Sequence, residues 1–124
     1  MTDQDDRTWM VHAMCAAVDA GDAESFGAWF TEDATYTFGN DETLVGRAAI
    51  IAATAGAAGA LPWVHHLVDQ IAAVGEDQLF CRFTIKTAAP DGKALALPCV
   101  TVIRLADSLV CDYRVHMDLT PALE

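Results

Sequence analysis

The stretch from Leu95 to Asp118 constrains the fold of this chain more than any other segment. It holds two apolar, β-branched runs, LALPCVTVIRL and LVCDYRVHMD, which the short polar segment ADS joins. Two such runs with a short turn between them predict a long antiparallel hairpin. Strand alternation then places Arg114, His116 and Asp118 on one face of the second strand. Because charged groups on a mostly apolar strand need water, a partner or a ligand, this hairpin also bears on function.

The first half of the chain predicts helices. Apolar residues at helical spacing indicate a helix over 8–20, which Gly21 would end. Asp22 is a suitable N-cap for a short second helix, and an alanine-rich third helix is expected over 47–58. Residues 1–6 are polar and are expected to fray.

The second half of the chain predicts strands, since apolar and β-branched runs there are bounded by turn residues. The expected strands are two short ones at 34–38 and 43–45 and four long ones at 63–74, 78–88, 93–105 and 109–119. Helices gathered on one face of such a sheet give an α+β fold with a cone-shaped, curved antiparallel sheet. The mouth of such a cone can hold a ligand.

The length and composition indicate a single domain over residues 1–124. Hydrophobic residues make up 53% of the chain, and its mean hydropathy is +0.25. This is rich for a soluble monomer of this size. We therefore expect an additional buried surface in an internal pocket, in an oligomer interface, or in both.

The formal net charge of -11 narrows the range of partners. It disfavours nucleic acids and anionic membranes, whose phosphates would be repelled, and it favours a neutral or apolar small ligand. No apolar run approaches the ~20 residues of a membrane span, and the N-terminus lacks a secretory pattern. The four cysteines lack CxxC spacing and lie in apolar runs. We expect them to be reduced core residues of a cytoplasmic protein, with no metal site and no cofactor implied.

Five segments carry a family resemblance; they read VDAGDAESFGAWFTEDATY, LVGRAAI, HLVDQ, PDGKALALPCVTVIRL and YRVHMDLTP. Together they resemble the nuclear transport factor 2-like superfamily, and its SnoaL-like branch most closely. The resemblance implies the cone fold and a homodimer formed through the outer face of the sheet, with Leu67, Ile71, Phe83 and Ile85 as candidates for that face. It implies no single activity, because the superfamily includes isomerases, hydrolases, dehydratases, polyketide cyclases and non-catalytic binding domains.

The best preserved site pattern is that of the dehydratases and dehydrochlorinases of this superfamily. These enzymes set a histidine at the start of the first long strand against an aspartate at the end of the first helix, and His66 and Asp19 hold those positions. In such a pair the neutral imidazole abstracts a proton from carbon, while the carboxylate fixes its tautomer and stabilises the imidazolium. Because a carboxylate at a helix C-terminus opposes the helix dipole, we also expect a cation or hydrogen-bond donor beside Asp19.

Two other patterns of the superfamily are less complete. The ketosteroid isomerase pattern would need ionisable groups where this chain has Met14, Phe38 and Thr101, so we reject that activity. The epoxide hydrolase pattern keeps an arginine, Arg82, and a carboxylate, Asp118, but its second carboxylate falls on a threonine. Arg82 and Asp118 would polarise a substrate or a water, or they would form a structural ion pair with each other.

These observations give one leading hypothesis and two alternatives. The leading hypothesis is a SnoaL-like homodimer that acts on a small hydrophobic molecule as a lyase, isomerase or cyclase, with His66 as the base and Asp19 orienting it. The alternatives are a non-catalytic ligand-binding or dimerisation domain, and epoxide-hydrolase-like hydration by Asp118 and Arg82. The residues expected to line the pocket are Met14, Trp29, Tyr36, Phe38, Trp63, Thr101 and His116.

Overall fold

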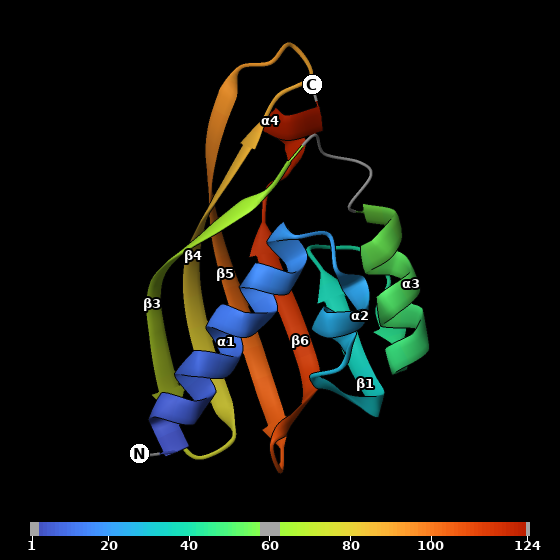
Figure 1. The fold of residues 1–124 in the computed structure, drawn as a ribbon, viewed down its shortest axis with the longest axis vertical. Helices are drawn as coiled ribbons and strands as arrows, with labels where there is room; N and C mark the ends of the chain where they lie inside the picture. The colour runs from blue at the N-terminus through green and yellow to red at the C-terminus, as the bar shows by residue number, and fades with distance from the viewer. Residues whose placement is uncertain (1–2, 58–62, 124) are drawn as a thin grey trace.

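A six-stranded sheet with helices on one face forms the framework of the protein (Figure 1). The structure, a computed structural model, describes residues 3–57 and 63–123, so the end expected for the third helix at residue 58 lies outside the described residues. None of the described helices is both long and apolar enough to cross a membrane. In chain order the elements are α1 (Asp3–Asp19), α2 (Ala23–Gly27), β1 (Phe30–Phe38), β2 (Leu44–Val45), α3 (Arg47–Ala57), β3 (His65–Val74), β4 (Gln78–Ala88), β5 (Ala94–Ala106), β6 (Leu109–Met117) and α4 (Thr120–Leu123).

The four long strands form an antiparallel meander, as the sequence predicts. The strand order across the sheet is β2-β1-β6-β5-β4-β3, so β2 and β3 are the two edge strands. The turn between β5 and β6 places Asp107 at φ 59°, a left-handed conformation that aspartate tolerates better than most residues. β1 pairs with the other side of β6 in parallel, and it carries β2 as an antiparallel neighbour.

The first three helices cover the concave face of the sheet and bury the core beneath them (Figure 1). α1 ends in a glycine cap, in which Gly21 has φ 72° and the N–H of Asp22 donates to Ala17 O at 2.9 Å. Asp22 then caps α2, because its side chain accepts the N–H of Ser25 at 3.1 Å. These two caps, both predicted from the sequence, determine where α1 stops and therefore where its last residue, Asp19, lies.

Several element ends differ from the sequence prediction. α1 begins at Asp3, so residues 3–6 are helical rather than frayed. β1 begins at Phe30, four residues before the predicted start, because an irregularity in its pairing with β6 lets the strand continue through a polar segment. β6 stops before Asp118, whose Oδ1 accepts the N–H of Thr120, the first residue of α4, at 2.9 Å. This short helix was not predicted from the sequence.

The outer face of the sheet carries different side chains from those predicted. β3 contains a register shift between Val68 and Gln70, and beyond it Ile71 turns inward and packs against the core. Phe83 and Ile85 are 2% and 4% exposed and belong to the core as well. Leu67 alone of the four predicted residues lies on the outer face. The large exposed apolar residues of the face over β3, β4 and β5 are Leu67, Val74, Phe80 and Val100.

Candidate active site

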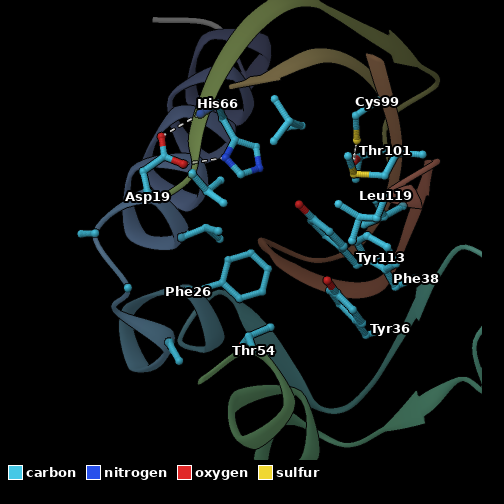
Figure 2. Close-up of a pocket in the computed structure, with 18 of the residues that line it drawn as sticks. Asp19, Phe26, Tyr36, Phe38, Thr54, His66, Cys99, Thr101, Tyr113 and Leu119 are labelled. Atoms are coloured by element: carbon cyan, nitrogen blue, oxygen red, sulfur yellow. Dashed lines mark hydrogen bonds and ion pairs between the residues drawn. The ribbon is translucent and has the colours of Figure 1, made fainter. Parts of the chain in front are cut away.

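Asp19 and His66 meet at the edge of the sheet, although 47 positions separate them in the sequence. Asp19 is the last residue of α1, and His66 is the second residue of β3. Because β3 is an edge strand, the backbone N–H of His66 can point away from β4, and it donates to Asp19 Oδ2 at 2.9 Å. Nδ1 of the His66 ring lies 2.6 Å from Asp19 Oδ1 (Figure 2). One carboxylate therefore holds both the backbone and the ring of the same histidine.

This arrangement determines which nitrogen of the His66 ring carries the proton. An ionised carboxylate can only accept hydrogen bonds, so Nδ1 of the neutral ring is the protonated nitrogen. Nε2 is then the nitrogen with the free lone pair, and it lies on the side of the ring that faces the cavity (Figure 2). The side chains of Asp19 and His66 are 18% and 15% exposed, so the pair is shielded from most of the bulk water. The two donors from His66 also offset the unfavourable helix dipole at Asp19.

His66 forms part of the wall of a cavity of about 430 Å³ between the helices and the sheet. Small-molecule sites occupy roughly 300–1,000 Å³, so this cavity can hold a small organic compound. Its wall is mostly apolar and combines side chains from the helices with the inward-facing side chains of the strands. The largest side chains among them include Phe26, Tyr36, Phe38, Trp63, Tyr113 and Met117.

Tyr36 and Tyr113 form a stacked pair in this wall. Their ring centroids are 5.3 Å apart with an interplanar angle of 5°, because the two residues are register partners on β1 and β6. Burial raises the pKa of Tyr36 to about 12, and burial together with the neighbouring Tyr36 raises the pKa of Tyr113 well above its ordinary value. Both phenols are therefore protonated at neutral pH. Their oxygens point into the cavity, where they can donate hydrogen bonds to an occupant (Figure 2).

Cys99 and Thr101 on β5 add two weakly polar groups to the wall. Their side chains lie 3.6 Å apart, between Cys99 Sγ and Thr101 Oγ1, and both residues are buried. Burial raises the pKa of the Cys99 thiol, so it remains protonated and weakly nucleophilic at neutral pH. The cavity thus combines one acid–base pair with several neutral hydrogen-bonding groups inside apolar walls.

Arg82, His116 and Asp118 lie outside this cavity, which corrects the prediction that they act on an occupant there. Arg82 and His116 are exposed, because the strand residues on either side of each point into the core. Asp118 is exposed just beyond β6, and hydrogen bonding from Thr120 holds its pKa below the ordinary value. In the described part of the chain, no ion pair joins Arg82 to Asp118. Hydration of an epoxide in this cavity would therefore lack both of its predicted groups.

The other predicted pocket residues divide into two groups. Met14 is 2% exposed within the core and is not part of the cavity wall. Trp29 packs edge-to-face against Trp9, with ring centroids 5.7 Å apart, and also lies outside the wall. The residues that do line the cavity are Tyr36, Phe38, Trp63 and Thr101.

Tyr113 was not among the residues predicted to form the site. Only the charged residues at positions 114, 116 and 118 of this strand were given roles, and its alternate positions were given none. Strand alternation was the signal that could have found it, because Tyr113, Val115 and Met117 must face the interior if the charged set faces water. In the structure these alternate residues do face the interior, and all three line the cavity.

A curved sheet covered by three helices, with a cavity of small-molecule size between them, defines the cone-shaped α+β class of ketosteroid isomerase-like and NTF2-like proteins. Within this class, the chain belongs to the SnoaL-like domain family, whose model matches residues 11–113. The family predicted from the sequence is confirmed. Comparison with curated proteins gives no match.

Solved structures with the same fold include proteins crystallised with small molecules. A protein of ketosteroid isomerase-like fold from Catenulispora acidiphila DSM 44928, in complex with trimethylamine, has a TM-score of 0.82 and 22% identity over 92% of this chain and 88% of its own. The epoxide hydrolase/cyclase-like enzyme SalBIII, which has a role in pyran ring formation in polyether salinomycin, has a TM-score of 0.81 and 20% identity over 98% and 97%. TerC, co-crystallised with polyporic acid, has a TM-score of 0.78 and 17% identity over 91% and 92%. At these identities the likeness establishes the fold alone.

Proposed function

We propose that this protein is a cofactor-independent enzyme of the lyase, isomerase or cyclase type, which transfers a proton from carbon in a small hydrophobic molecule. The observation that carries the proposal is the 2.6 Å contact between Asp19 Oδ1 and His66 Nδ1 at the wall of an apolar cavity. A neutral imidazole oriented by a carboxylate is suited to proton abstraction. His66 is the base, and Asp19 acts through it as a positioning residue.

The proposed reaction begins when His66 Nε2 takes a proton from a carbon next to a carbonyl group. The electron pair of the broken C–H bond forms a double bond to the carbonyl carbon, and the carbonyl oxygen becomes an enolate oxygen. The O–H groups of Tyr36 and Tyr113 donate to this oxygen as its charge grows. The His66 imidazolium, stabilised by Asp19, then returns the proton to another carbon in an isomerisation or to a departing hydroxyl group in a dehydration.

The proposed substrate is a neutral, flat compound with at least one carbonyl oxygen. Aromatic walls favour flat rings, and a net charge of -11 disfavours anionic ligands. Two proteins of this fold, the one from Catenulispora acidiphila and TerC, were crystallised with trimethylamine and polyporic acid, which supports small-molecule binding by the fold. The role of SalBIII in ring formation supports a cyclase as one form of the activity.

Exchange of carbon-bound hydrogen for deuterium tests this proposal without knowledge of the natural substrate. The probe is 2-tetralone, a flat bicyclic ketone, incubated with the protein in D₂O and followed by proton NMR. We expect the protein to accelerate exchange next to the carbonyl, and His66→Gln to reduce that acceleration by about 10²–10⁴-fold. His12→Gln, at an exposed position on α1, is the matched control and should exchange as the wild type does. Equal rates for wild type and His66→Gln would contradict the assignment, and tetralone binding without exchange would favour a binding module.

We also propose that the protein is a homodimer joined through the outer face of its sheet. Leu67, Phe80 and Val100 are 39%, 39% and 40% exposed on that face, opposite the helices. Phe80, Arg82 and Val100 border the same shallow hollow, so the apolar residues there lie close together. An apolar centre with an arginine at its side resembles the composition of protein interfaces. A second copy of the chain, related by a two-fold axis, would bury this patch on both copies at once.

A further inference from the structure

Asp19 has a second histidine neighbour, which the proposed reaction does not use. His65 Nδ1 lies 3.3 Å from Asp19 Oδ2, the same oxygen that accepts the backbone N–H of His66. The two histidines are adjacent in β3, so their side chains leave the strand on opposite sides. The His65 side chain is 60% exposed, whereas that of His66 is 15% exposed. The Asp19 carboxylate therefore lies between one histidine that faces the cavity and another that faces solvent.

We propose that His65 is a positioning residue that adjusts the basicity of His66 through the carboxylate they share. Asp19 carries one negative charge and can compensate only one positive charge. When His65 is protonated, its positive charge already interacts with the Asp19 carboxylate. A second positive charge on the His66 ring is then less favourable. The catalytic consequence rests on the proposed function, because a protonated His65 makes His66 a weaker base.

Other titratable groups surround this cluster without replacing His65 in that role. Lys86 on β4 is the register partner of His65 and is exposed. Hydrogen bonds from Ser25 hold the pKa of Asp22, in the turn after α1, below its ordinary value. On α1, burial and the nearby Asp19 charge raise the pKa of Cys15 to about 12. Asp22 stays ionised and Cys15 stays neutral while histidines titrate, so neither produces a change of charge at Asp19 in that pH range.

NMR titration of the histidine ring protons, in the full chain without any ligand, tests the proposal. His65→Gln removes the titrating charge, and His65→Lys keeps a positive charge at that position across the histidine range. We expect the midpoint of the His66 titration to move to higher pH by about half a unit in His65→Gln, well within the spread of about one unit seen for histidines in folded proteins. In His65→Lys the midpoint should stay at or below that of the wild type. His12→Gln, which removes an exposed histidine from α1, should leave it unchanged.

The two His65 variants separate an electrostatic role from a structural one. If His65 only supports the local fold, both variants will move the His66 midpoint in the same direction, and that result overturns the proposal. An unchanged midpoint in His65→Gln overturns it as well. Because the titration needs no substrate, it can succeed even where the exchange experiment with His66→Gln fails, so the two failures are distinguishable. Where both succeed, the acid limb of the pH–rate profile for tetralone exchange should move with the His66 midpoint.

Discussion

Asp19 accepts hydrogen bonds from both the backbone N–H and the ring of His66, at 2.9 Å and 2.6 Å. The backbone bond holds the carboxylate at a defined place along β3, and the ring bond then holds the imidazole against the carboxylate. The two hydrogen bonds together restrict the side-chain torsions of both Asp19 and His66. A site built in this way on a helix end and a strand is preorganised, so less ordering is required when a substrate binds.

Asp19→Asn should abolish most activity while preserving the fold. The asparagine oxygen can still accept the backbone N–H of His66, but its amide group can donate to Nδ1 and favour the tautomer in which Nε2 carries the proton. We expect tetralone exchange to fall by about 10²–10⁴-fold. Asp19→Ala should in addition leave a half-buried N–H without its partner and lower the free energy of unfolding by about 1–3 kcal/mol. Exchange rates and urea denaturation measure the two effects, and full activity in Asp19→Asn would contradict the role of Asp19.

Tyr36 and Tyr113 are the only tyrosines of the chain, so its tyrosine absorbance reports on this pair alone. Because burial raises the pKa of Tyr36 from 10.0 to about 12, we expect tyrosinate absorbance of the folded protein to appear only near the upper value. The tyrosines of the unfolded state ionise at lower pH than those of the folded state. The contribution of the neutral, buried tyrosines to the free energy of unfolding is therefore fully present below about pH 10 and is lost as the pH rises toward 12. Between these two pH values the free energy of unfolding should fall by about 1.4 kcal/mol per pH unit for each tyrosine. Ionisation near pH 10 with a native circular dichroism spectrum would contradict this environment.

Gly27 and Gly56 form a matched pair of glycine positions. A Cβ added at Gly27 would overlap the Ile51 side chain, whereas one added at Gly56 has open space around it. Gly27→Ala should therefore lower the free energy of unfolding by about 1–3 kcal/mol. Gly56→Ala, in helix α3, should raise it by about 0.5–1 kcal/mol. Urea denaturation measures both, and in an Ile51→Ala background the cost of Gly27→Ala should shrink; an unchanged cost would exclude this overlap as its cause.

The outer face of the sheet should control self-association. We expect sedimentation velocity to give a dimer for the wild type at micromolar concentration and a monomer for Phe80→Lys, because the substitution places a charge in the apolar patch. Val45→Lys is the control, since Val45 is 68% exposed but lies on β2, at the other edge of the sheet. A monomeric wild type would refute the proposed dimer.

Arg82→Ala and Asp118→Ala should both leave tetralone exchange at the wild-type rate. Both side chains are exposed, and neither belongs to the cavity wall around His66. The same NMR assay measures them beside His66→Gln. Loss of exchange in either variant, with dimerisation intact, would mean that the chemistry does not take place in the cavity described above.

Local chemistry made much of the fold predictable. The long strands follow from runs of β-branched and apolar residues, and the end of α1 follows from Gly21 and Asp22, whose preferences act within a few residues. The candidate pair Asp19 and His66 came from segments that resemble a family, not from spacing. The start of β1 at Phe30 was not predictable in the same way, because its pairing with β6 overrides a polar local sequence.

The sequence by itself determined which residues share a face in the regular parts of the strands, since side chains there alternate with a period of two. Only the tertiary structure decided which of those faces turns toward the helices. It put Tyr113 in the cavity wall and Arg82 outside it, and the register shift in β3 turned Ile71 inward. The contact of His65 with Asp19 is likewise tertiary, because it depends on a helix end packing against an edge strand. Alternation is a local property of the backbone, whereas the choice of the buried face depends on contacts between segments far apart in the chain.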